Sequence, residues 1–146
     1  MSWVRIYVHM VFSTKRREPY LDSIELRKSV FQHIKKNAEQ NGIWLDCVSG
    51  HQDHANCLIS LGREQTISKV AQLIKGESSF WINQNNLTPE KFAWQDDYWV
   101  VGVSESHVEA VRRYIHNQEQ HHSSQSFSDE IEEFMKKYGW SYVKAK

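Results

Sequence analysis

The chain has 146 residues, a length that fits one compact domain and is short for two. Its hydrophobic content of 40% and aromatic content of 12% support a packed core and exclude disorder along the whole chain. The 18 basic and 18 acidic side chains give a formal net charge of zero, so the overall charge neither favours nor excludes a nucleic-acid partner.

Cysteine spacing and hydropathy exclude further classes of protein. Cys47 and Cys57 stand alone, which excludes a disulfide framework and a four-cysteine zinc site. No apolar run approaches the roughly 20 residues that a membrane helix needs, and the start of the sequence lacks a signal-peptide pattern. We therefore expect a cytoplasmic protein.

The first third of the chain predicts a strand and a helix. Residues 4–12 alternate between apolar and polar side chains, which is the period of a half-buried strand. A basic loop over residues 15–17 follows. Asp22 and Glu25 have the spacing of a capping box, and an apolar repeat then predicts a helix that ends near Asn41.

The rest of the chain continues this alternation. Two strands are predicted around a short polar turn, followed by an amphipathic helix that starts after Thr66. Ser104 is a candidate N-cap for a third helix, and a short helix is expected near the end. The predicted ranges are strands at 43–49, 54–61 and 98–103, and a last helix around Ile131, Phe134 and Met135.

The order of the elements indicates the α+β class. Strand, helix, strand, strand, helix, strand is the split βαβ, ferredoxin-like order, an antiparallel sheet with helices on one face. A C-terminal helical extension follows. A fold of this kind specifies no function by itself.

Two polar clusters are candidates for chemistry. His54 and Asn56 are two residues apart on a predicted strand, so their side chains point to the same face, and both residue types can bind a divalent ion. Tyr114 and Gln118 are one turn apart on the predicted third helix and share a stripe. Taken alone, each pair is more often part of an ordinary solvated surface.

The order of these clusters resembles a known family. The pattern of His-x-polar on a central strand and Tyr-x-x-x-Gln on a later helix is similar to the single-tyrosine transposases of the HUH endonuclease superfamily, including those associated with repetitive extragenic palindromes. The likeness covers most of the chain, and its segments are residues 4–17, 53–59, 73–79, 94–98, 104 and 114–118.

The resemblance implies a reaction and a set of site residues. Tyr114 would attack a phosphorus of single-stranded DNA at hairpin ends, leaving a 5′-phosphotyrosine. His54, Asn56 and Gln118 would hold Mg²⁺ or Mn²⁺, and the protein would act as a homodimer with the tyrosine helix placed in cis or in trans. Residues 1–122 would form the catalytic domain, with residues 123–146 as its helical tail.

The chain departs from the family pattern at Asn56, where the family has histidine. An amide oxygen suits magnesium or manganese but is a weaker donor than imidazole toward later transition metals. His51 is a conceivable substitute, although we expect it in the turn and on the wrong side of the strand.

DNA contacts are expected from local clusters, because the net charge is zero. Cationic side chains in the first loop and on the second predicted helix can contact phosphates, and aromatic side chains near the fourth strand can stack on bases. Each also has a structural alternative, as a solvated turn or a core residue. The cations are Lys15, Arg16 and Arg17 in the loop and Arg63, Lys69 and Lys75 around the second helix, and the aromatic residues are Trp94, Tyr98 and Trp99.

Two other functions remain open at this point. One is a hairpin-binding protein on the same scaffold, in which Asn56 has weakened or abolished the chemistry. The other is an unrelated metabolic domain of ferredoxin-like fold, which would not bind DNA.

Overall fold

The computed structural model describes residues 1–118, 129, 132–133 and 136. The predicted last helix and almost all of the predicted tail over 123–146 lie outside the described residues. No helix in the described part of the chain is long and apolar enough to cross a membrane. The elements in chain order are β1 (Ile6–Ser13), η1 (Lys15–Arg17), α1 (Ile24–Gln40), β2 (Trp44–His51), β3 (His54–Leu61), α2 (Ile67–Gln84), β4 (Trp99–Val103), η2 (Glu105–His107) and α3 (Val108–His116).

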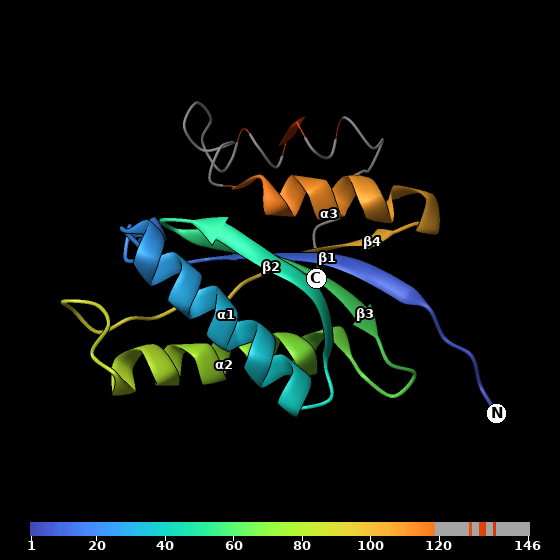
Figure 1. The fold of residues 1–146 in the computed structure, drawn as a ribbon, viewed down its shortest axis with the longest axis horizontal. Helices are drawn as coiled ribbons and strands as arrows, with labels where there is room; N and C mark the ends of the chain where they lie inside the picture. Colours follow the sequence, from blue (N-terminus) through green and yellow to red (C-terminus); the bar gives the residue numbers. More distant parts are fainter. Residues whose placement is uncertain (119–128, 130–131, 134–135, 137–146) are drawn as a thin grey trace.

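The four strands form one antiparallel sheet in the order β2-β3-β1-β4. This arrangement confirms the predicted ferredoxin-like sheet. Helices α1 and α2 cover one face, as expected, while α3 lies across the opposite face (Figure 1). The sheet is therefore the middle of three layers.

The alternation of side chains along the central strands produces two cores. On β1 and β3, the residues of one parity pack under α1 and α2, with Met10 and Cys57 fully buried. The other parity faces α3, where Leu58 packs with Val111 and Ile115. Because both faces of the sheet are covered, polar residues on the α3 side are buried as well.

The helix starts agree with the sequence in one case and differ in two. Helix α2 begins after Thr66 as predicted, and the Thr66 hydroxyl accepts from the Lys69 N–H at 3.2 Å. The N-cap of α1 is Ser23 rather than Asp22, because the Ser23 hydroxyl accepts from the Leu26 N–H at 3.1 Å. Ser104 precedes η2, and its hydroxyl contacts His107 Nδ1 at 2.7 Å instead of capping α3.

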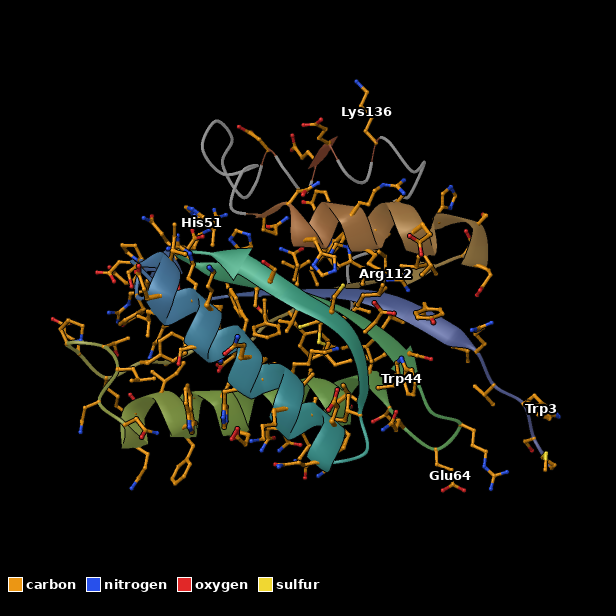
Figure 2. All side chains as sticks on the ribbon, viewed as in Figure 1. Trp3, Trp44, His51, Glu64, Arg112 and Lys136 are labelled. Atoms are coloured by element: carbon orange, nitrogen blue, oxygen red, sulfur yellow. The ribbon has the colours of Figure 1, made fainter. Side chains whose placement is uncertain are left out.

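The hairpin between β2 and β3 is tighter than the sequence predicted. Strand β2 continues through His51, whose Cα partner is His54. Residues directly opposite each other in an antiparallel pair face the same side of the sheet. The expectation that His51 lies in the turn and points away from His54 is therefore wrong. His51 lies at the end of β2 (Figure 2).

Gly50 is required where β2 approaches β3. A Cβ at this position would lie 2.0 Å from the His54 carbonyl oxygen and 2.9 Å from the Ala55 Cα, both of which are backbone atoms. We expect Gly50→Ala to lower the free energy of unfolding by about 2 kcal/mol, measured by urea denaturation, because the strands must separate.

The matched control is Gly76→Ala in α2. A Cβ there meets nothing within 4 Å, so helix propensity should raise stability by about 0.5–1 kcal/mol. Equal effects of the two substitutions would contradict the close approach of the strands.

Candidate catalytic centre

Four polar side chains are buried between the sheet and α3. His9 on β1, His54 and Asn56 on β3, and Gln118 just beyond α3 are at most 2% exposed. The other interpretation of His54, Asn56 and Gln118, that they belong to an ordinary solvated surface, is therefore wrong. Buried polar groups need partners, because an unpaired one costs several kcal/mol by the usual transfer estimates (roughly 2–7).

Gln118 brings the two predicted clusters together. Its Oε1 lies 3.0 Å from His54 Nε2 and 3.0 Å from Asn56 Nδ2. The two β3 side chains reach the same oxygen because they are two residues apart on one strand. The structure thus places the three predicted metal ligands around a single point.

The orientation of the His54 ring is also fixed by a hydrogen bond at its other nitrogen, Nδ1. Its Nδ1 lies 2.8 Å from Asp53 Oδ1, so Nδ1–H donates to the carboxylate and, in the neutral ring, Nε2 is left with a lone pair. Nε2 and Gln118 Oε1 then meet as two acceptors, an arrangement that a cation stabilises. A carboxylate on the far nitrogen of a histidine is also the usual support of a metal ligand.

The spacing of these atoms fits a small divalent ion. Neighbouring ligands of an octahedral ion with bonds of about 2.1 Å lie roughly 3.0 Å apart, which matches the separation of His54 Nε2 from Gln118 Oε1. The atom of Asn56 that lies 3.0 Å from Gln118 Oε1 is Nδ2, an amide nitrogen that does not bind a cation. No group of three His, Cys, Asp or Glu side chains suited to a metal occurs in the described part of the chain. The donors directed at this point are the His54 imidazole and the Gln118 amide oxygen, and an amide oxygen suits Mg²⁺ or Mn²⁺ better than zinc.

His9 belongs to this cluster and was missed as a site residue by the sequence analysis. Its Nε2 lies 2.8 Å from Asn56 Oδ1. Its ring packs edge-on against Trp99 and Tyr114, with centroid separations of 5.8 and 5.9 Å. The sequence showed only a histidine on the polar face of the first strand. Its place in the cluster can be recognised only once β1 is known to pair with β3.

Helix α3 is held on the sheet by apolar contacts and by one ion pair. Val108, Val111 and Ile115 are buried on this face of the sheet. Arg112 reaches from α3 to β2, where its Nε and Nη2 donate to the two carboxylate oxygens of Asp46 at 2.9 and 2.8 Å (Figure 2). The Arg112 guanidinium lowers the pKa of the Asp46 carboxyl below its usual value.

Docking of α3 brings Tyr114 to the same region. Tyr114 is half-buried, packs with the α3-side core and lies beside His9. The helix rests on the sheet of its own chain, so a single chain supplies the tyrosine, His54, Asn56 and Gln118.

The basic turn lies next to the cluster. Thr14 N–H donates to the Asp53 carbonyl at 2.8 Å, and Thr14 Oγ1 donates to the Glu18 carbonyl at 2.7 Å, so the turn is anchored at both ends beside His54. Lys15, Arg16 and Arg17 are all exposed. They form η1, in which both arginines have left-handed backbone angles, φ 57° and 56°.

The other predicted DNA-binding cations are elsewhere. Lys69 and Lys75 lie on α2, which covers the sheet face opposite to α3. Lys69 is exposed, whereas Lys75 is half-buried and donates to the Asp96 carbonyl at 2.7 Å. The structure therefore does not bring these lysines together with the cluster around Gln118.

The three aromatic residues predicted to stack on DNA bases lie in different environments. Trp94 is a core residue, because it is 6% exposed, packs edge-on against Phe12 and donates from Nε1 to Ser78 Oγ at 2.9 Å. Trp99 is half-buried against His9. Tyr98 is 39% exposed, and Lys75 Nζ lies over its ring, 5.6 Å from the centroid.

Comparison with known proteins identifies the family. The sequence profile described as "Transposase IS200 like" matches residues 2–118. The chain belongs to the IS200-like transposase family. This excludes the second open function, an unrelated metabolic domain of ferredoxin-like fold. The resemblance found in the sequence is confirmed.

Solved structures show the same fold. A Deinococcus radiodurans R1 protein proposed to be a transposase is 24% identical, with a TM-score of 0.62 over 80% of this chain and 93% of that one. A REP-associated tyrosine transposase bound to a REP hairpin is 11% identical, with a TM-score of 0.54 over 81% of this chain and 67% of that one. No match was found among the curated proteins.

Burial of His9 makes the stability of this transposase depend on pH. Desolvation lowers the pKa of His9 from 6.5 to about 4, so between these values the unfolded chain binds the proton and the folded chain does not. We expect acidification from pH 7 to pH 4 to remove about 3 kcal/mol of stability through this residue. Urea denaturation of the wild type and of His9→Gln at several pH values measures it.

The difference between the two proteins isolates His9, since all other groups titrate in both. The wild type should lose stability relative to His9→Gln as the pH falls. Parallel stability curves would show that His9 does not titrate as a buried neutral ring.

Proposed function

We propose that this transposase cleaves and rejoins single-stranded DNA through Tyr114 with a divalent metal ion. The observation that carries the proposal is the meeting of Gln118 with His54 and Asn56, 3.0 Å from each, two residues beyond the helix that bears Tyr114. Helix α3 and the residues directly after it would thereby supply both a ligand and a nucleophile, which holds the two near each other before DNA binds.

The reaction would be a transesterification at phosphorus. Tyr114 Oη attacks the phosphorus, its proton is released, and the bond from phosphorus to the 3′-oxygen breaks. The products are a 5′-phosphotyrosine and a free 3′-hydroxyl, and attack by another 3′-hydroxyl reverses the step. Because the phosphodiester energy is kept in the covalent intermediate, rejoining requires no ATP.

Different residues of the chain would have different roles in this reaction. Asp53 holds His54 in the tautomer that presents Nε2, while packing of Tyr114 against His9 limits the motion of the phenol. A Mg²⁺ or Mn²⁺ ion bound by His54, Asn56 and Gln118 would polarise a non-bridging phosphate oxygen. A tyrosine hydroxyl is a weak nucleophile at neutral pH, so this polarisation supports the attack.

Hairpin DNA is the proposed partner. The REP-associated transposase that shares this fold is bound to a REP hairpin, and the exposed η1 turn lies beside His54 in this chain. We propose that Lys15, Arg16 and Arg17 contact the phosphates next to the cleaved bond. Lys69 and Lys75 would contact a different part of the DNA, since they lie on α2.

We also propose a homodimer, in keeping with the resemblance found in the sequence. The ligands and the tyrosine all come from one chain in this structure, so pairing is not needed to complete the site. A second copy would serve to hold two DNA ends near each other.

A specific observation favours the alternative of a hairpin-binding protein with impaired chemistry. Asn56 presents its Nδ2 to Gln118 Oε1, while its Oδ1 is bonded to His9. An amide nitrogen does not bind a cation, so in this orientation Asn56 is not a ligand. The two functions differ in whether a covalent adduct forms.

The first test is formation of that adduct. A single-stranded hairpin oligonucleotide labelled on the 3′ side of the cleavage site is incubated with the protein and Mn²⁺, and the products are separated by denaturing electrophoresis. We expect a protein–DNA adduct with the wild type and none with Tyr114→Phe. Both proteins should bind the hairpin equally in a mobility-shift assay.

Asn56→His separates the two functions further. If the wild type binds the hairpin without forming an adduct and Asn56→His forms one, the protein is the impaired binder. An adduct that survives Tyr114→Phe would overturn the assignment of the nucleophile.

The second test concerns the basic turn. Each phosphate contact on single-stranded DNA contributes about −0.7 to the slope of log K against log salt concentration. We expect Arg16→Ala with Arg17→Ala to weaken binding and reduce the steepness of this slope by about 1.4. Fluorescence anisotropy over a range of NaCl concentrations measures both.

Lys28→Ala with Lys36→Ala is the matched control. Both lysines are exposed on α1, on the sheet face opposite to α3, and their loss should leave the slope unchanged. Equal changes in the two double variants would place the DNA elsewhere on the surface.

A further inference from the structure

The orientation of the Asn56 carboxamide conflicts with a role in binding a cation. Gln118 Oε1 is an acceptor, and Asn56 directs its Nδ2 donor at that oxygen from 3.0 Å. Asn56 Oδ1 consequently faces His9 Nε2 at 2.8 Å, so Nε2 must carry the ring proton. In this state the one atom of Asn56 that can bind a metal is held by His9.

A half-turn of the carboxamide resolves the conflict. Oδ1 and Nδ2 exchange places with little movement of heavy atoms, because the two ends of an amide are nearly equal in size. Oδ1 then lies beside Gln118 Oε1, and Nδ2 faces His9. Nδ2 is a donor, so His9 Nε2 must now accept, and the single proton of the ring must reside on Nδ1.

The surroundings of His9 require the amide and the proton to move rather than the ring. His9 is 1% exposed, and its ring is held edge-on by Trp99 and Tyr114. A fixed Nε2 next to Asn56 can accept or donate according to its tautomer. Ordinary histidine supports of metal sites act by the same principle, in which the hydrogen bond on one side selects the orientation on the other.

We propose that His9 is a positioning residue for the metal ion, and that its tautomer determines whether Asn56 presents oxygen or nitrogen to the centre. With the proton on Nε2, His9 holds Asn56 in the orientation that excludes the ion. With the proton on Nδ1, His9 accepts from Nδ2 and keeps Oδ1 directed at the ion. The ring stays neutral in both states, so no net proton is gained or lost.

This inference rests on the proposed metal centre and adds a role for a residue outside the ligand set. It also accounts for an asparagine that serves in place of the histidine expected from the resemblance. A histidine ligand would be fixed by its own ring geometry, whereas a carboxamide needs a neighbour that selects one of its two ends.

The decisive experiment reads the tautomer directly. Long-range ¹H–¹⁵N correlation spectra of the full ¹⁵N-labelled chain are recorded at neutral pH without and with saturating MgCl₂, and the His9 and His54 signals are assigned from His9→Phe and His54→Gln. We expect His9 to carry its proton on Nε2 without Mg²⁺ and on Nδ1 with it. The His54 signals report independently whether the ion has bound.

The outcomes separate this inference from the proposed function. A shift of His54 with an unchanged His9 tautomer would overturn the role of His9 and leave the metal centre standing. No change at either histidine, at any Mg²⁺ concentration up to tens of millimolar, would overturn both.

A second measurement tests the same role through affinity. Mn²⁺ binding is measured by electron paramagnetic resonance of the free ion. We expect His9→Phe to weaken binding by about tenfold, the low end of the effect of removing a group that supports a ligand. In an Asn56→Asp background either carboxylate oxygen can face the ion, so His9→Phe should change the affinity less than about threefold there. Equal losses in the two backgrounds would show that His9 supports only the fold.

Discussion

The oxygen Oε1 of Gln118 is the point on which the organisation of the site depends. It accepts from one side chain of β3 and lies against the imidazole of another, at 3.0 Å in both cases. Gln118 reaches this position because α3 packs its apolar stripe on the outer face of the sheet and Arg112 pairs with Asp46. Without that docking, His54 and Asn56 would form a polar stripe on an uncovered sheet.

Covering both faces of the sheet has an energetic consequence. His9, His54, Asn56 and Gln118 lose their water when α3 docks, and each must find a partner inside the protein. The network meets most of this demand within the cluster, but the pairing of His54 Nε2 with Gln118 Oε1 brings two acceptors together when the ring is neutral. A cation between these two acceptors would remove that conflict, which supports the proposed metal centre.

The same network explains how an asparagine can stand where the resemblance leads one to expect a histidine. A carboxamide has one end that binds metal ions and one that does not, so its use as a ligand depends on what lies on its other side. In this chain that neighbour is the buried imidazole of His9, which can donate or accept without changing its charge. The local chemistry of the site is therefore distributed over β1, β3 and the end of α3.

Local patterns were sufficient for much of the fold and for part of the site. The alternation in the first strand, the start of α2 after Thr66 and the range of β3 followed from the period of the side chains, which acts within a few residues. The choice of Ser23 over Asp22 as a cap did not, because both have suitable side chains and only the path of the backbone selects between them. The extension of β2 to His51 depended on a close approach of two strands at Gly50.

Taken by itself, the sequence determined the fold class, the family and three members of the polar cluster, since these depend on the order and spacing of residues along the chain. Only the tertiary structure decided that α3 covers the sheet of its own chain, that His9 joins the cluster and that Trp94 belongs to the core. The physical reason is that pairing between β1 and β3 joins residues 47 positions apart. Which side chains meet across such a distance is set by strand register and by desolvation, and neither is visible in a local pattern.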